Sequence, residues 1–554
     1  MPAPATPRST RADAAAGALL AALVLAASAT SLANGFAYDD SAAIVANARV
    51  HELRSPLAYL GESYWPPESS GSLYRPVTIV GFAVQWALGG GSALPFHVTS
   101  VLLKLAATLV AWRLLRRALG AGGGPWDAAW WGAAFFAVQP VHTEAVGNAV
   151  GQAELHALLG TTTAAWLYLR ARVGGAPGPG VPLALVGCAL WAALGKEQGI
   201  LAPAFLALLE VTVVRDPTPW RARLRALMPT YAALALAMLG VVAARTAVLG
   251  GDLAGPVHWA LRGLSWPERL WTMLAFVPTW LRLLFAPWHL RAEYNPPSFP
   301  PAHAFGMAQA AGLAALVGVK LAAWQLRRVA PAVTAGVGWI ALALLPVSNV
   351  LVPTGILLAD RTLLLPSVGG ALVVAGALAA GWTSLARRPS LARALAGAGV
   401  ALLAAFTWRS ADRMRAWHDS GTLFRQMVAD DPRSYKAHFH LGESLFATGQ
   451  PAAAAEAMGR AYRLWDGDGR MLEDYGQVLQ HEGRCAEALV PLRRALVLEA
   501  DRLKARNRLY FCLLKTGGYD EAVRVAEAGV ALGDTIFAGY ARRADSLRRA
   551  ASAP

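Results

Sequence analysis

Two neighbouring carboxylates, Asp39 and Asp40, are the residues of this chain best suited to chemistry. They follow an apolar run from Ala14 to Leu32 and stand beside Phe36 and Tyr38. Ionisable groups at the end of a hydrophobic helix are costly, and membrane proteins keep them mainly where they do chemistry or bind ions. A carboxylate at the water–membrane boundary can accept the proton of a hydroxyl group, and an adjacent carboxylate raises its proton affinity. The alternative is that the pair caps a helix or binds a cation.

Further groups of polar residues stand between apolar runs in the same part of the chain. They are His142 with Glu144, Lys196 with Glu197, Glu293 with Tyr294, and Asp360 with Arg361. The sequence has no glycine-rich phosphate loop and no nucleophile elbow, and its three cysteines lack the spacing of a zinc site. The candidate chemistry therefore rests on carboxylates and basic side chains.

The segments that carry these groups have the composition of membrane helices. Hydrophobic residues make up 55% of the 554 residues and charged residues 15%, whereas a soluble chain carries about 25% charged residues. Apolar runs recur through the first 408 positions, many of them roughly 17 or more residues long and able to cross a hydrocarbon core of about 30 Å. We read the first run as an uncleaved span rather than a signal peptide, because it exceeds the usual length of a signal-peptide core.

Arginines cluster in the short segments between these runs, as the positive-inside rule requires of cytoplasmic loops. With a cytoplasmic N-terminus, the clusters fit about eleven crossings if Val77 to Leu88 and Leu270 to Phe285 lie in the interface or re-enter it, and roughly thirteen if both cross. The eleven expected spans are 14–32, 98–115, 128–138, 155–169, 183–194, 200–214, 226–249, 305–326, 333–347, 363–385 and 391–406.

This topology places all the polar groups and the C-terminus on the extracytoplasmic side of the inner (plasma) membrane. A transporter more often places its ionisable groups near the midplane, in broken helices. Polar loops on one side of an apolar bundle indicate an enzyme that acts on a lipid-borne substrate. The arginine clusters account for the net charge of +15, so we expect no nucleic-acid partner.

Small residues recur every 34 positions beyond Thr407, where long apolar runs stop. They are Gly449, Gly483 and Gly517; Ala454, Ala488 and Ala522; and Ala461, Ala495 and Gly529. A helix-turn-helix unit of this length with small residues at helix contacts is the tetratricopeptide pattern. We expect three repeats, near 435–468, 469–502 and 503–536, in a periplasmic domain 409–550 that follows a transmembrane domain 1–408. Such arrays bind partners on a concave face.

The order of motifs resembles the transmembrane and tetratricopeptide-repeat-containing family. The motifs are FAYDD at 36–40, YRPVT at 74–78, FHV at 96–98, FAVQPVHTEAV at 136–146, QAEL at 152–155, KE at 196–197, and LPSVG at 365–369. That family resembles protein O-mannosyltransferases of the GT-C superfamily. The resemblance implies an all-α fold, a polytopic helix bundle followed by a tetratricopeptide α-solenoid.

The resemblance also implies a reaction, the transfer of a sugar with inversion from a polyprenyl-phosphate donor to a hydroxyl acceptor, with mannose and a protein or peptide favoured. One carboxylate takes the hydroxyl proton, and the motif slightly favours Asp39 over Asp40. The departing phosphate needs a cation, for which Lys196, Arg361 and Arg245 are the candidates. The other interpretation of Lys196 is a snorkelling side chain at the end of a span. The expected active-site loops carry Tyr74, Arg75, His142, Glu144, Glu154, Glu197, Glu293 and Tyr294.

No cofactor is expected to be required. A divalent cation held by Glu144 and His142, with Glu154 nearby, is the alternative. The chain departs from the family at Gln139 and Gln152, where the family has His and Arg, and after Arg361, where two family tyrosines are missing. These departures bear on the identity of the sugar and the acceptor. A second function stays open, a membrane-anchored tetratricopeptide scaffold, or a flippase or assembly component for surface polysaccharide, without catalysis.

Overall fold

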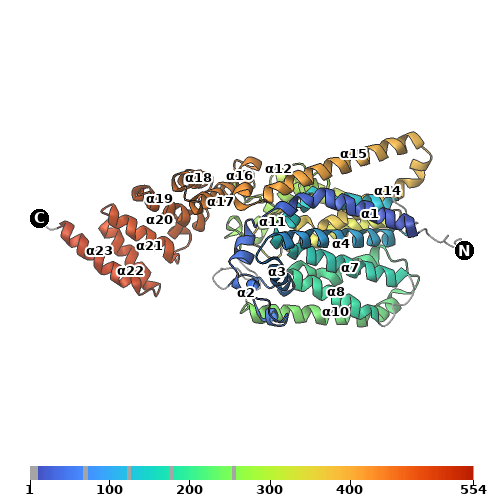
Figure 1. The fold of residues 1–554 in the computed structure, drawn as a ribbon, viewed down its shortest axis with the longest axis horizontal. Helices are drawn as coiled ribbons and strands as arrows, with labels where there is room; N and C mark the ends of the chain where they lie inside the picture. Colours follow the sequence, from blue (N-terminus) through green and yellow to red (C-terminus); the bar gives the residue numbers. More distant parts are fainter. Residues whose placement is uncertain (1–9, 67–72, 121–126, 174–179, 252–256, 553–554) are drawn as a thin grey trace. The chain divides into compact units, whose positions relative to one another are not determined.

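The computed structural model describes residues 10–66, 73–120, 127–173, 180–251 and 257–552 (Figure 1). Within these ranges the chain forms helices and turns but no β-strand, which confirms the all-α fold class. The helices divide into two compact units. The first comprises residues 1–258, 263–292 and 302–420, and the second comprises 259–262, 293–301 and 421–554.

The first unit is a bundle of predominantly apolar helices. Its helices are α1 (Thr10–Ser28), α3 (Pro76–Gly89), α4 (Leu94–Leu119), α5 (Ala128–Ala137), α7 (Gln152–Val173), α8 (Gly180–Gly195), α9 (Ala202–Thr212), α10 (Trp220–Val248), α11 (Trp266–Phe285), α12 (Met307–Leu326), α13 (Pro331–Leu344), α14 (Pro366–Ala386) and α15 (Pro389–Met414), together with the short α2 (Ala48–His51) and α6 (Thr143–Gly147).

Five helical segments within the described ranges are long and apolar enough to cross a membrane. They are 11–33, 94–119, 220–248, 307–326 and 389–417. Five shorter apolar helices accompany them, at 76–89, 128–137, 180–195, 331–347 and 366–381. The chain is therefore a membrane protein, whereas the number of crossings and their orientation stay predictions.

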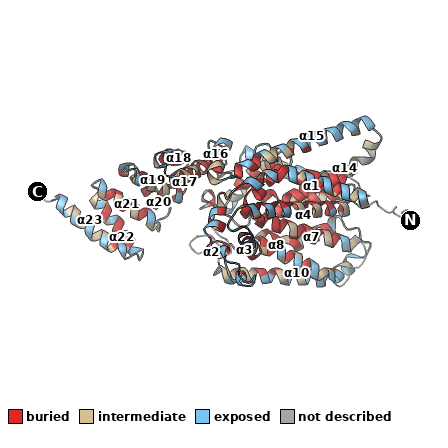
Figure 2. Cartoon of the chain, in the orientation of Figure 1, coloured by how far each residue is buried: buried red, intermediate tan, exposed pale blue. Residues whose placement is uncertain are grey.

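Small residues let the bundle helices approach closely. A Cβ atom on Gly336 of α13 would lie 2.5 Å from the carbonyl oxygen of Gly369 in α14, and the reverse holds for Gly369. Gly132 of α5 packs in the same way against Ala375 of α14. Such small-residue contacts are typical of helix packing in lipid, where hydrophobicity does not itself drive association. Figure 2 shows the resulting core, in which most residues of α7 are buried.

The second unit is a succession of antiparallel helix pairs. After α16 (Ser420–Asp430) it contains α17 (Tyr435–Ala447), α18 (Pro451–Leu464), α19 (Gly469–His481), α20 (Cys485–Leu498), α21 (Leu503–Lys515), α22 (Tyr519–Ala531) and α23 (Ile536–Ser552). Gly449, Gly483 and Gly517 each follow the first helix of a pair with φ between +75° and +78°, a conformation that glycine adopts at little cost.

Gly442 and Gly476, which are also 34 positions apart, lie at helix contacts within the pairs. A Cβ atom on Gly442 would lie 2.5 Å from Cγ of Met458, and one on Gly476 would lie 2.4 Å from Cδ2 of Leu492. The helix pairs and their spacing give this unit the architecture of tetratricopeptide repeats. The division into domains 1–408 and 409–550 stays a prediction.

Candidate active site

Three sets of ion pairs gather the ionisable residues of the first unit's interhelical segments. Arg75 and Arg245 share Glu197, Lys196 contacts Glu154, and Arg361 contacts Glu144. These seven side chains come from six places in the sequence. We call them the charged cluster. Five of the seven stand at or next to helix ends, where the apolar runs stop and the backbone turns.

The two neighbouring carboxylates have different surroundings. Asp40 is fully buried, and its Oδ2 accepts hydrogen bonds from the backbone N–H groups of Ala37 at 3.1 Å and Ala149 at 3.2 Å. Its Oδ1 accepts a third, from the N–H of Val150 at 2.8 Å. Asp40 therefore holds two distant backbone segments together, and its side chain makes no capping hydrogen bond to the helical turn Ser41–Val45 that follows it.

Asp39 is half-buried, and its carboxylate makes no hydrogen bond or ion pair with any residue that the structure describes. The residue before it, Tyr38, has φ of +56°, a left-handed conformation that non-glycine residues rarely adopt and that often occurs at functional sites. Of the two carboxylates, Asp39 is thus the one available to accept a proton.

Burial raises the pKa of the Asp40 carboxyl from 3.8 to about 7. The three backbone N–H groups act in the opposite direction, and the neighbouring Asp39 adds to the rise. Loss of hydration disfavours the charged form of a buried carboxyl group.

Glu197 lies between two guanidinium groups. Its carboxylate oxygens are 2.8 Å from Nη2 of Arg75 and 3.0 Å from Nη1 of Arg245. Burial alone would raise the pKa of this carboxyl, but Arg75, Arg245 and Lys196 lower it to about 2. Glu197 is therefore ionised at neutral pH and fixes the two arginines in place.

Lys196 stands at the end of α8, where the sequence predicts a phosphate-binding cation. Its ammonium group contacts the carboxylate of Glu154, near the start of α7. Burial lowers the pKa of Lys196 well below its ordinary value, and Arg75 and Arg361 lower it further. Glu197 and Glu144 act in the opposite direction on this pKa, so Lys196 lies within reach of both the basic and the acidic groups of the charged cluster.

Arg361 is tied to Glu144 by its backbone as well as its side chain. The Arg361 N–H donates to Oε2 of Glu144 at 2.8 Å, and the guanidinium contacts Oε1. Tyr64, which was not predicted from the sequence, is buried beside Arg75. The guanidinium of Arg75 lies 5.2 Å from the centroid of its ring, and Asp39 and Arg361 are close enough to influence its pKa, which burial raises.

Tyr64 is also a candidate for ligand contact. Its hydroxyl group is buried and has no hydrogen-bond partner within the described part of the chain. A buried, unpaired hydroxyl group is costly, and its position among Asp39, Arg75 and Arg361 suits a group that bonds to substrate.

Tyr74, Glu293 and Tyr294, which were also expected at the site, are not members of the charged cluster. Tyr74 donates its hydroxyl hydrogen bond to the carbonyl oxygen of Leu60 and supports the loop before α3. Glu293 and Tyr294 belong to the second unit, where Glu293 pairs with Lys436 at 2.7 Å. These two residues are thus part of the unit that contains the repeats rather than members of the charged cluster.

His142 contacts a basic residue and a hydroxyl group. Its Nδ1 approaches Nζ of Lys104, and its Nε2 lies 2.7 Å from Oγ of Ser367. Glu144 meanwhile binds Arg361. Over the described ranges, no three His, Cys, Asp or Glu side chains are grouped as metal ligands.

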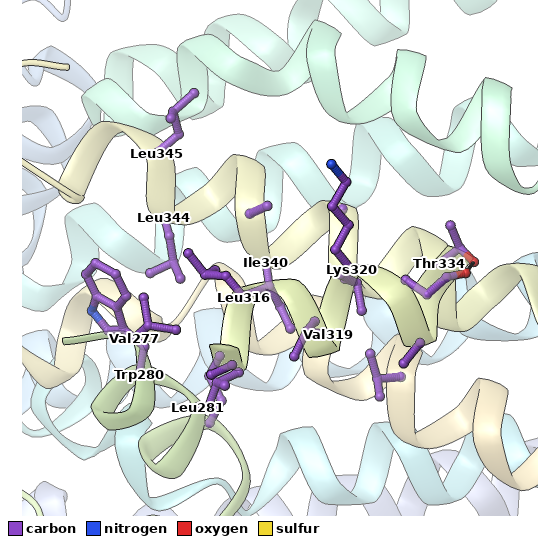
Figure 3. Close-up of a pocket in the computed structure, with 18 of the residues that line it drawn as sticks. Val277, Trp280, Leu281, Leu316, Val319, Lys320, Thr334, Ile340, Leu344 and Leu345 are labelled. Atoms are coloured by element: carbon purple, nitrogen blue, oxygen red, sulfur yellow. Dashed lines mark hydrogen bonds between the residues drawn. The ribbon is translucent and has the colours of Figure 1, made fainter. Parts of the chain in front are cut away.

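An apolar cavity of about 1090 Å³ lies among α9, α11, α12, α13 and α14 (Figure 3). Trp280 of α11, Leu316 of α12 and Ile340 of α13 contribute to its walls, and Lys320 of α12 adds a basic group. A cavity of this character between membrane helices suits a hydrocarbon chain better than a polar ligand.

The chain is similar to curated proteins named protein O-mannosyl-transferase. It is 26% identical over 470 residues to protein O-mannosyl-transferase TMTC4 of Homo sapiens, covering 76% of this chain and 62% of that protein. It is 27% identical over 527 residues to Tmtc3 of Drosophila melanogaster (82% and 55%) and 24% identical over 440 residues to F38B6.6 of Caenorhabditis elegans (78% and 60%). These relatives confirm the resemblance that the motifs indicate.

The chain spans about three-fifths of the length of these relatives. No family model matches it. Among solved structures, the crystal structure of the APC/C hetero-tetramer Cut9-Hcn1 matches with a TM-score of 0.22 and 10% identity, covering 85% of this chain and 89% of that chain. A TM-score this low carries no argument about fold or function.

Proposed function

We propose that this protein is an integral membrane glycosyltransferase that moves a sugar, with mannose favoured, from a polyprenyl-phosphate donor to a hydroxyl group of a protein acceptor. The observation that supports the proposal is that one unit holds both Asp39, whose carboxylate has no partner among the described residues, and the basic side chains of the charged cluster. The names of the relatives support the same reaction class.

In the proposed reaction, the oxygen of the acceptor hydroxyl attacks the anomeric carbon of the sugar while Asp39 accepts the proton of that hydroxyl. The bond from that carbon to the phosphate oxygen breaks, the configuration inverts, and the lipid phosphate leaves. General base catalysis by a placed carboxylate contributes about 10²- to 10⁴-fold. Asp40 holds the backbone on which Asp39 is presented and takes no proton from the substrate.

The departing phosphate gathers negative charge, which placed cations stabilise most strongly where water is excluded. Arg75, Lys196, Arg245 and Arg361 supply four basic groups, which pair with the carboxylates of Glu144, Glu154 and Glu197. The carboxylates hold the basic groups in position before substrate arrives, so little reorganisation is needed. We assign phosphate contact to Arg361 and Lys196, with Arg75 and Tyr64 beside them.

The apolar cavity supports a lipid-linked donor. The residues around it come from five helices of the bundle and are almost all hydrocarbon or aromatic, as a polyprenyl chain requires. We propose that this cavity takes up part of that chain.

The repeats supply the protein-binding element of the proposal. Tetratricopeptide arrays bind other polypeptides on a concave face and have no reaction of their own. We propose that they recruit the acceptor and that, by the positive-inside rule, the repeats and the charged cluster face the extracytoplasmic side. The reaction needs no resident metal in this proposal, so chelation with EDTA leaves transfer unchanged.

Membranes containing the protein, supplied with a labelled polyprenyl-phosphate sugar and an extract of envelope proteins, test the proposal. We expect labelled protein with the wild type and with Asp412→Asn, a matched change at an exposed carboxylate of α15. Asp39→Asn should reduce labelling at least about 100-fold. Equal labelling by Asp39→Asn and the wild type would contradict the enzyme and favour a scaffold.

A further inference from the structure

A basic side chain is fully buried in the middle of α4, far from the ends of the helix. Lys104 is 1% exposed. Its Nζ donates a hydrogen bond to the carbonyl oxygen of Phe136 at 3.1 Å and lies 4.0 Å from the centroid of the Phe136 ring. No carboxylate contacts it in the described ranges. Ionisable residues inside membrane helices are costly and usually functional.

The remaining partner of Lys104 is His142, which extends the contact into a chain of hydrogen bonds. Nζ of Lys104 approaches Nδ1 of His142, and Nε2 of His142 lies 2.7 Å from Oγ of Ser367. The hydroxyl of Ser367 in turn donates to the carbonyl oxygen of Leu364 at 2.6 Å. Because the hydroxyl proton of Ser367 is donated to Leu364, Nε2 of His142 carries the proton that is donated to Ser367, and Nδ1 accepts from the amino group of Lys104.

This chain of hydrogen bonds joins the same two segments as the Arg361–Glu144 pair. His142 precedes Glu144 by two residues, and Arg361 precedes Ser367 on the segment that leads into α14. The segments are therefore connected twice, once through His142 and Ser367 and once through Glu144 and Arg361. Lys104 anchors the first connection to α4 and to the end of α5.

We propose that Lys104 is a positioning residue for the Arg361–Glu144 pair and acts on it through His142 and Ser367. The proposal rests on the proposed function, in which Arg361 contacts the donor phosphate. Lys104 itself touches no substrate. It keeps the segment that carries Arg361 in register with the segment that carries Glu144, so that the guanidinium is placed before the donor binds.

Steady-state kinetics with separately varied donor and acceptor test this role. Lys104→Met should raise the KM for the donor at least about tenfold and leave the KM for the acceptor within about twofold, because Arg361 is displaced while the acceptor site is intact. Ser367→Ala should act in the same direction. Ser100→Ala is the matched control, since this buried hydroxyl of α4 bonds only within its own helix, and it should leave both values unchanged.

A double-mutant cycle separates positioning from general loss of packing. If Lys104 acts through Arg361, Lys104→Met should have little further effect on the donor KM in an Arg361→Gln background. A purely structural role would instead lower the amount of active enzyme and leave the donor KM unchanged. That result, or additive effects of the two variants, would overturn the proposal.

Nitrogen-15 spectra of labelled histidine provide a measurement that does not require activity. A His142→Gln variant identifies the His142 signals among those of the eleven histidines, and Lys104→Met should shift the Nδ1 signal that has lost its donor. Unchanged His142 signals would refute the network whether or not sugar transfer is observed. Absence of transfer by the wild type, with the signals shifted, would count against the proposed function alone.

Discussion

Alanine substitutions at the two neighbouring carboxylates should affect different properties, the rate of sugar transfer at Asp39 and the stability of the fold at Asp40. In the folded protein Asp39 has no partner among the described residues, whereas Asp40 accepts three backbone hydrogen bonds. Asp39→Ala should therefore remove the general base and leave the fold intact. Asp40→Ala should weaken the connection between the segment after α1 and the segment before α7.

The magnitudes follow from the contacts. In Asp40→Ala the N–H of Val150 keeps the side chain of Asn148 as its acceptor, but the N–H groups of Ala37 and Ala149, both in fully buried residues, lose theirs. Two buried donors at about 1–3 kcal/mol each give a loss of about 2–6 kcal/mol in the free energy of unfolding. Asp39→Ala should stay within about 0.5 kcal/mol of the wild type and lose about 10²- to 10⁴-fold in rate.

Thermal unfolding of the purified variants in detergent at pH 6, together with sugar transfer by the same preparations, measures both effects. Destabilisation of Asp39→Ala as large as that of Asp40→Ala would show that Asp39 has a structural role. Sugar transfer by Asp39→Ala at a rate within a few-fold of the wild type would show that Asp39 is not the general base.

Three further outcomes are expected. The pKa of Asp40 is about 7 in the folded protein against an ordinary 3.8, so the stability that its protonated form contributes is full below about pH 4 and is lost as the pH rises through about 7. The free energy of unfolding of the wild type should therefore fall over that pH range, and that of Asp40→Ala should fall less. Arg75→Gln removes one partner of Glu197, whose pKa is held at about 2. The variant should lose about 1.5–3 kcal/mol in the free energy of unfolding at pH 7, and progressively less as the pH falls from about 4.5 to 2. Unfolding measured over that acid range tests this. Gly476→Val places side-chain atoms against Leu492 and should lower the stability of the repeats by about 1–3 kcal/mol, measured as an earlier unfolding transition of the full chain; an unchanged transition would contradict the packing.

The sequence was sufficient to predict the helical class and the repeats, because both depend on periodicity. A repeat of 34 residues determines which small residues meet at a helix contact, and Gly476 against Leu492 is one such contact. The number of crossings is harder to predict, since α5 and α8 are shorter than a full span and their depth depends on neighbouring helices.

Part of the candidate site was also predictable from the sequence. Lys196, Glu154 and Arg361 stand near helix ends, where polar residues interrupt apolar runs, so the local sequence was enough to identify them. The difference between Asp39 and Asp40 was not predictable locally, because the donors that bind Asp40 include Ala149 and Val150, more than a hundred residues away.

Two other residues were missed for different reasons. Tyr64 is a candidate because its buried hydroxyl group has no partner among the described residues and the guanidinium of Arg75 lies over its ring, and both features depend on the fold. Lys104 was visible in the sequence as an ionisable residue in the middle of the predicted span 98–115, nine residues before Arg113 near the end of that span. Such a residue should be treated as a functional candidate on its cost in lipid alone.

The most direct measurement of the central claim uses the purified protein in a lipid bilayer with polyprenyl-phosphate mannose and a serine- or threonine-containing peptide. Mass spectrometry should show mannose on a peptide hydroxyl with the wild type, and none above background with an equally folded Asp39→Ala. Transfer that persists in Asp39→Ala, or a folded wild type that leaves donor and peptide unchanged, would contradict the account.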